Sequence, residues 1–152
     1  MADLQVLLDT NILLRWLEPD VPDQIVVAAA LDRLLVARSV LCYTSQNLGE
    51  FWNTLTRPTE RNGYGLTPEQ ADRRAIAMES RLQLLPESNL VHEEWRRILV
   101  ENRISGIQVH DARLVASMRV HGVRRILTFN TKDFVRYSDI EALHPLQASQ
   151  LN

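Results

Sequence analysis

Short apolar runs alternate with helical patterns along the chain. Each apolar run has the length of a strand buried inside a sheet. The predicted strands are Leu4–Leu8, Val40–Tyr43, Leu82–Leu85, Arg125–Thr128 and, as a fifth strand before Pro145, Ile140–Leu143. The segments between them repeat apolar residues every three or four positions, which predicts helices with one buried face. The predicted helices are Asn11–Leu17, Ile25–Ala37, Ser45–Leu55, Thr67–Arg81, His92–Glu101 and Asp111–His121.

Several helix ends carry local signals. Pro22 suits a first helical position, and Ser45 is the expected N-cap of the helix that follows the second strand. Thr67-Pro-Glu-Gln70 reads as a capping box with proline at the first helical position. Gly122 is expected to end a helix, and Arg57–Leu66, with its proline, asparagine and two glycines, is expected to be a loop. Strands separated by helices favour an α/β fold, in which helices cover both faces of a parallel sheet.

The composition is that of one ordinary folded domain. The chain has 152 residues, 45% of them hydrophobic and 24% charged, with no internal repeat or linker, so residues 1–152 are expected to form a single domain. Its one cysteine, Cys42, cannot form an internal disulfide or a thiolate zinc cage and is expected to pack in the core. With neither a signal-peptide pattern nor a membrane-length apolar stretch, we expect a cytoplasmic protein without a membrane partner.

Charge is distributed unevenly. The net charge is −2, yet between Arg103 and Arg136 six arginines and Lys132 face only two acids, Asp111 and Asp133. This basic segment has two interpretations. It is either a surface that holds phosphates or simply a solvated set of helix faces.

Four acids draw attention because of where they stand. Asp9 directly follows the first strand, Asp133 lies just beyond the fourth, Asp111 starts a helix, and Glu50 lies in the helix after the second strand. Each also has an ordinary explanation as a cap, a turn residue or a solvated position. Ligands of open parallel sheets bind outside the carboxyl ends of the strands. Three of the acids flank that edge, and Glu50 can reach it.

Clustered carboxylates imply a cation, because their charges repel one another unless something neutralises them. Carboxylate oxygens suit Mg²⁺ or Mn²⁺, which keep several waters and also bind phosphate. Such a metal activates water and stabilises the leaving oxygen, so the pattern favours phosphodiester hydrolysis.

Four segments carry a family resemblance. Leu7-Leu-Asp-Thr-Asn-Ile-Leu-Leu14 resembles the opening strand of PIN domains, and Ser45-Gln-Asn-Leu-Gly-Glu-Phe-Trp52 resembles their second acidic segment. His110-Asp-Ala-Arg-Leu-Val-Ala116 and Ile126-Leu-Thr-Phe-Asn-Thr-Lys-Asp-Phe134 are similar to the closing half. The segments occur in the family's order and span nearly the whole chain. The resemblance implies a three-layer α/β/α fold with a central, mostly parallel sheet of four or five strands.

The resemblance also implies a Mg²⁺- or Mn²⁺-dependent endoribonuclease. Asp9, Glu50 and Asp111 match the metal-binding acids. For the fourth acid we expect Asp133, with Asn130, the nearer residue, holding a metal-bound water or a phosphate; if Asn130 is the true equivalent, a second metal site is weakened. Residues expected to orient the acids or hold phosphate are Thr10, Asn11, Thr128 and Asn130, and those expected to contact RNA are Arg113 and Lys132.

Small stand-alone PIN domains resemble VapC-type toxins, which implies an antitoxin partner and a homodimer. The helices after Pro22 and from Thr67 are the expected dimer contacts. A phosphatase with Asp9 as nucleophile is disfavoured, because Asn11 stands where a second aspartate is expected and Lys132 is the only lysine. A PIN fold that binds RNA or protein without cutting it remains the alternative.

Overall fold

The fold is built on one sheet of five parallel strands, seen in a computed structural model that describes residues 4–16, 18 and 22–150. The strand order is β3-β2-β1-β4-β5, and every neighbouring pair runs parallel. The sheet is therefore wholly parallel, and the predicted fifth strand is part of it. The strands are β1 (Gln5–Leu8), β2 (Val40–Thr44), β3 (Gln83–Leu85), β4 (Arg125–Leu127) and β5 (Glu141–Leu143).

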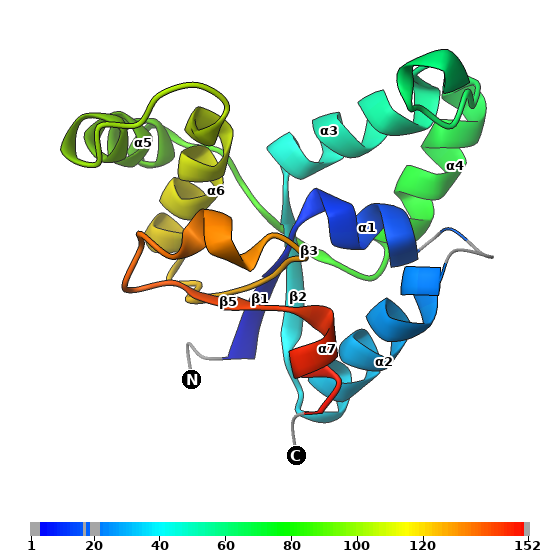
Figure 1. Cartoon of the computed structure of the whole chain (residues 1–152), viewed down its shortest axis with the longest axis horizontal. Helices are drawn as coiled ribbons and strands as arrows, with labels where there is room; N and C mark the ends of the chain where they lie inside the picture. The colour runs from blue at the N-terminus through cyan, green and yellow to red at the C-terminus, as the bar shows by residue number, and fades with distance from the viewer. Residues whose placement is uncertain (1–3, 17, 19–21, 151–152) are drawn as a thin grey trace.

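Helices cover both faces of this sheet. In Figure 1, α5 and α6 lie on one side, while α1 to α4 and α7 lie on the other. No helix among the described residues is both long and apolar enough to cross a membrane. The helices are α1 (Thr10–Trp16), α2 (Pro22–Val36), α3 (Ser45–Thr56), α4 (Pro68–Glu79), α5 (Asn89–Glu101), α6 (Gln108–His121) and α7 (Pro145–Ala148), with short 3₁₀ turns η2 (Thr59–Arg61) and η3 (Thr131–Phe134).

Alternation along the central strand divides the interior into two cores. Val6 and Leu8 of β1 enter the core beneath α1 to α4, whereas Leu7, between them, enters the core beneath α5 and α6. Successive side chains of a strand point to opposite faces, so a strand buried on both faces is apolar throughout. Cys42 is fully buried in the second core, as expected. The three-layer α/β/α architecture is confirmed.

Several predicted helix ends are confirmed, one cap is corrected, and α5 and α6 each begin three residues earlier than predicted. Thr67 and Gln70 form the predicted capping box, and Gly122 ends α6 with a φ of 70°. The N-cap of α3, however, is Thr44 rather than Ser45. Its hydroxyl accepts from the backbone N–H of Asn47, and the Asn47 side chain accepts from the backbone N–H of Thr44. The predicted end of the first helix at Leu17 lies outside the described residues.

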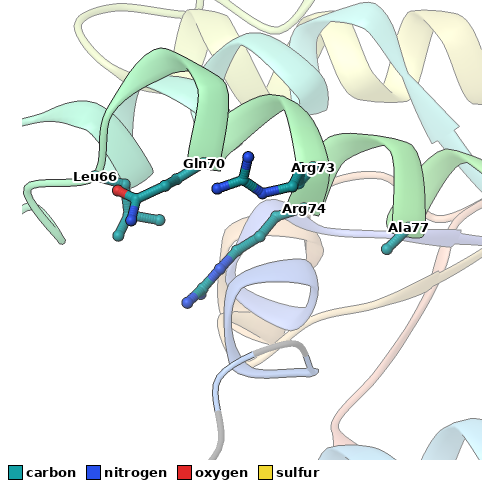
Figure 2. A pocket seen from close by; sticks show the side chains of 5 residues that line it. All are labelled: Leu66, Gln70, Arg73, Arg74 and Ala77. Carbon is teal, nitrogen blue, oxygen red and sulfur yellow. The ribbon is translucent and has the colours of Figure 1, made fainter.

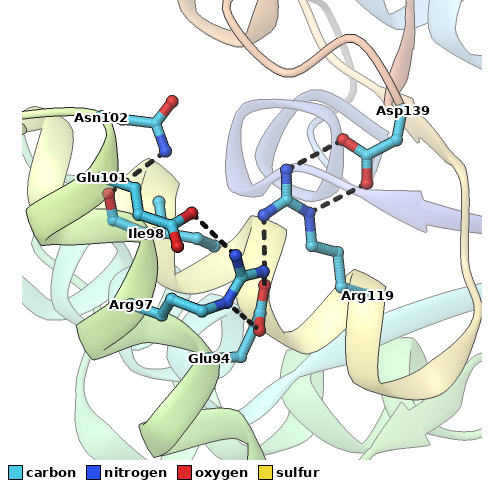
Figure 3. A network of polar contacts seen from close by, with 7 residues as sticks. All are labelled: Glu94, Arg97, Ile98, Glu101, Asn102, Arg119 and Asp139. Atoms are coloured by element: carbon cyan, nitrogen blue, oxygen red, sulfur yellow. Dashed lines mark hydrogen bonds and ion pairs between the residues drawn. The ribbon is translucent and has the colours of Figure 1, made fainter.

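Ion pairs connect α5 and α6 to each other and to the segment before β5 (Figure 3). Arg119 of α6 donates to Glu94 of α5 at 3.1 Å and, through two nitrogens, to Asp139 ahead of β5 at 2.9 Å. Arg97 bonds Glu94 and Glu101 on its own helix. Because α6 carries Asp111, this network also fixes the helix that brings that acid to the sheet.

Candidate active site at the carboxyl ends of the strands

The central strand ends where the chain's path across the sheet reverses. From β1 the chain builds outward through β2 and β3, and later returns to the other side of β1 for β4 and β5. Such a switch point leaves a crevice outside the carboxyl ends of the two strands. Asp9 occupies it: the residue follows β1, and its N–H donates to the carbonyl of Leu127 in β4 at 3.0 Å.

The Asp9 carboxylate is buried and held from both sides. Its Oδ1 accepts from the backbone N–H of Thr10 at 2.8 Å, and its Oδ2 accepts from the Thr128 hydroxyl at 2.7 Å. Burial raises the pKa of Asp9, the charges of Glu50 and Asp133 raise it further, and the two hydrogen bonds oppose the rise. Because these bonds leave lone pairs free, the carboxylate can still bind a cation.

Glu50 reaches the same place from the side of α3. Its Oε2 accepts from the Thr10 hydroxyl at 2.7 Å, and its Oε1 accepts from Nε2 of Gln46 at 3.0 Å. The same Gln46 nitrogen donates to the carbonyl of His110, just before Asp111. Gln46 thus links the helix that carries Glu50 to the helix that carries Asp111.

Asp111 and Asp133 complete the group. Asp111 lies half-buried in the first turn of α6, and Asp133 lies in η3 after β4. Burial raises the pKa of Asp111 to about 7, and the charges of Asp9, Asp133 and Glu50 add to the rise. The structure therefore brings Asp9, Glu50 and Asp133 within electrostatic reach of Asp111, and Glu50 and Asp133 within reach of Asp9. Of the two residues considered for the fourth position, Asp133 is part of this group, while the Asn130 side chain is exposed.

These residues fit a hard divalent cation that keeps part of its water shell. Across residues 4–16, 18 and 22–150, no three His, Cys, Asp or Glu side chains converge into a ready metal-binding cluster. Mg²⁺ does not need one, because it commonly binds through one or two carboxylates and keeps several waters. The oxygen-only donors suit such a cation, and its charge would offset the repulsion that raises the pKa of Asp9 and Asp111.

The other predicted residues divide into two sets. Thr10 and Thr128 bond acid side chains directly. Asn11, by contrast, accepts from the backbone N–H of Phe129 at 3.4 Å, and Asn130 donates its backbone N–H to the Thr128 hydroxyl at 3.0 Å. Asn11 and Asn130 therefore help to shape the loop after β4. Lys132 lies exposed on η3, beside Asp133.

An open cleft of about 500 Å³ begins beside Glu50, between α3 and α6. Arg113 lies on its wall, paired with Glu87 at 3.1 Å and with its guanidinium 5.6 Å from the Trp95 ring centre. The cleft therefore places Arg113 on the same surface as Glu50. The lining residues are Ser45, Gln46, Gly49, Glu50, His110 and Arg113.

Several arginines of the basic segment from Arg103 to Arg136 are already bonded to other side chains, which the sequence did not indicate. Arg119 and Arg125 pair with acids, and Arg136 donates to Gln108 at 2.7 Å. The acids lie outside the segment, so counting charges within it could not reveal them. These three arginines bond to side chains of other elements, so fewer of the segment's positive charges are free to bind phosphates.

A second hollow, of about 430 Å³, lies along α4 (Figure 2). Figure 2 shows Arg73 and Arg74 extending from α4 beside Leu66, Gln70 and Ala77. Arg74 is bound to Glu18 at 2.8 Å, and the described residues that line the hollow include no carboxylate. The described part of this hollow is therefore a basic surface, separate from the four acids.

Two residues near the acids were missed from the sequence. Gln46 stands one helical turn before Glu50, so spacing of i and i+4 could have indicated their bond. Asn47 contacts Thr10, which lies 37 residues earlier, and no local pattern reveals such a contact.

Comparison with known proteins identifies the family of this chain and solved structures with a similar fold. The family profile described as PIN domain matches residues 6–140. Among solved structures, the chain is similar to a chain of VapBC2 from Rickettsia felis bound to a DNA fragment from their promoter (18% identity, TM-score 0.66, covering 92% of this chain and 98% of that one). It is also similar to DNA-bound VapBC from Salmonella typhimurium (18%, 0.64, 93% and 98%). A third is Mycobacterium tuberculosis VapC20, a Sarcin-Ricin loop cleaving toxin (18%, 0.61, 87% and 95%). No curated protein matches the chain.

Proposed function

Because this chain belongs to the PIN-domain family, whose members are typically nucleases, we propose that it is a Mg²⁺- or Mn²⁺-dependent endoribonuclease. The observation that carries the proposal is the meeting of Asp9, Glu50, Asp111 and Asp133 at the switch point of the sheet. A protein that held these acids for structure alone would gain nothing from their mutual repulsion. A site built for a cation requires them to be close.

Each part of the site has a separate task in this reaction. The four acids would hold the metal, one or two of them directly and the others through its bound waters, and the metal would supply an activated water and stabilise charge on the phosphate. Thr128 and Thr10 keep the carboxylates of Asp9 and Glu50 turned toward the crevice. Lys132 on η3 and Arg113 in the cleft would hold the phosphates on either side of the cleaved bond.

We propose further that the protein is the toxin of a type II toxin–antitoxin pair, inactive while its antitoxin is bound. The similar solved structures include complexes of toxin with antitoxin, and this chain covers nearly all of the matched chains. A homodimer is also proposed, through α2 and α4. Exposed apolar side chains on both helices support it: Ile25, Leu35 and Val36 on α2, and Ile76 on α4.

The nuclease is tested by cleavage of a labelled RNA pool in Mg²⁺, in Mn²⁺ and in EDTA. The purified protein should cut RNA only with metal, and Asp9→Ala and Asp111→Ala should each lower the rate at least a hundredfold. Glu93→Ala is the control, because Glu93 is an exposed acid on α5, outside the group of four and outside the proposed dimer helices. Cutting that survives both active-site variants would refute the assignment.

If the antitoxin-free wild type cuts neither the RNA pool nor purified tRNA and rRNA, the result favours the alternative function without catalysis. The protein would then be a PIN fold that binds RNA or a protein partner without cutting it.

Sedimentation of the purified chain tests the homodimer separately, since Val36→Asp on α2 should shift a dimer toward monomer.

A further inference from the structure

Asn47 is a completely buried polar residue just behind the acids. It lies in the first turn of α3, where its Oδ1 accepts from the backbone N–H of Thr44 at 2.9 Å and from the Thr44 hydroxyl at 3.0 Å. Its Nδ2 lies 3.3 Å from the hydroxyl oxygen of Thr10. A helix cap needs only the Asn47 oxygen, so the cap does not account for the contact made by the nitrogen.

The orientation of the Asn47 amide follows from its partners. The Thr44 backbone N–H can only donate, so the atom facing it must be the amide oxygen. The other end, facing Thr10, is therefore the NH₂ group, which can only donate. Thr10 accepts this bond with its hydroxyl oxygen.

The direction of the Thr10 hydroxyl proton is decided in turn. A hydroxyl has a single proton, and its oxygen already faces a donor on the Asn47 side. The proton is left to point the other way, to Oε2 of Glu50 at 2.7 Å. The three side chains thus form a chain of two hydrogen bonds that run in one direction: Asn47 donates to Thr10, and Thr10 donates to Glu50.

We propose that Asn47 is a positioning residue for the metal site, acting on Glu50 through Thr10. By directing the Thr10 proton, it holds one Glu50 oxygen, while Gln46 holds the other. The carboxylate is then fixed in one orientation with lone pairs left for a cation. This inference rests on the proposed metal-dependent function of the same site.

The variant that isolates this role is Asn47→Asp. Aspartate keeps an oxygen for the Thr44 cap but replaces the NH₂ donor with a second acceptor. The Thr10 hydroxyl then has two carboxylates competing for one proton, so Glu50 loses a defined partner. Asn53→Asp is the matched control, because it adds the same charge at an exposed position of the same helix.

The measurement is equilibrium Mn²⁺ binding by each purified protein, followed by electron paramagnetic resonance of free Mn²⁺. Asn47→Asp should bind Mn²⁺ about tenfold more weakly, in the range found for residues that orient metal ligands. Asn53→Asp should bind like wild type. Added negative charge alone would leave cation binding unchanged or tighten it, so weaker binding separates positioning from charge.

Thr10 provides a second test that does not touch the cap of α3. Thr10→Val should weaken Mn²⁺ binding as much as Asn47→Asp does, whereas Thr10→Ser, which keeps the hydroxyl, should retain it. The double variant Asn47→Asp/Thr10→Val should bind no worse than either single one, because both act through one hydrogen bond. Equal binding by the Val and Ser variants would overturn the proposal, even if Asn47→Asp does not fold.

The Asp9→Asn variant distinguishes a failure of the Asn47 positioning role from a failure of the metal site itself. If wild type binds Mn²⁺ and Asp9→Asn weakens that binding while Asn47→Asp matches Asn53→Asp, the positioning role is wrong and the metal site stands. If Asp9→Asn binds as wild type does, the metal-site assignment itself fails.

Discussion

Replacing Asp111 with asparagine should stabilise the metal-free protein, although it removes a residue proposed to be essential for cleavage. Burial and the neighbouring acids raise the pKa of Asp111 from 3.8 to about 7. Folding at neutral pH therefore forces an ionised carboxylate into a place that disfavours its charge. Asparagine has nearly the same shape and no charge, so this cost disappears.

The magnitude follows from the pKa. A rise from 3.8 to about 7 corresponds to about 4 kcal/mol at 1.36 kcal/mol per pH unit. Asp111 is only half-buried, and solvent screening reduces such values, so we expect Asp111→Asn to raise the free energy of unfolding by about 1–2 kcal/mol at pH 8.

The raised pKa of Asp111 fixes the direction in which wild-type stability changes with pH. Between pH 4 and pH 7 the folded protein holds a proton on Asp111 that the unfolded chain has lost, so wild-type stability falls as pH rises through this window. Above the folded-state pKa both states are ionised, and the full cost persists. The stability gap between Asp111→Asn and wild type should therefore widen from pH 4 to 7 and then level off.

Urea unfolding in EDTA at pH 5, 6.5 and 8 measures this gap, with Glu93→Gln as the control at an exposed position of α5. Adding Mn²⁺ at pH 8 should then stabilise wild type more than Asp111→Asn, because only the former keeps the full set of acids. A gap that is absent at pH 8, or equal at pH 5 and pH 8, would refute the electrostatic reasoning.

Two further predictions concern the scaffold. Gly63→Ala should lower the free energy of unfolding by about 2 kcal/mol in urea titrations, because an added Cβ would lie 1.9 Å from the carbonyl oxygen of Arg57. Gly49→Ala, with nothing within 4 Å of its added Cβ, should instead be neutral or stabilising by up to about 1 kcal/mol, and equal losses in both would contradict the packing argument. Cys42 should resist thiol reagents at pH 8 until the protein unfolds, since burial raises its pKa to about 11; rapid labelling under native conditions would show that this core opens.

Local sequence patterns predicted most of the scaffold. Alternating apolar runs and helical spacing indicated the parallel sheet with two helical layers, because side-chain periodicity directly reflects which faces are buried. Thr67 and Gly122 marked helix ends through local chemistry alone. The N-cap of α3 was misplaced by one residue, since Thr44 and Ser45 are both good caps and only the end of β2 decides between them.

The sequence by itself determined that Asp9 and Asp133 lie at one edge of the sheet, because both follow strands that run in the same direction. Only the tertiary structure decided how they are held and charged. The hydroxyls on Asp9 and Glu50 come from Thr128 and Thr10, 119 and 40 residues away. The raised pKa of Asp111 comes from burial and from charges on other elements. Such pairings and desolvation depend on register and packing between distant segments, which no local pattern contains.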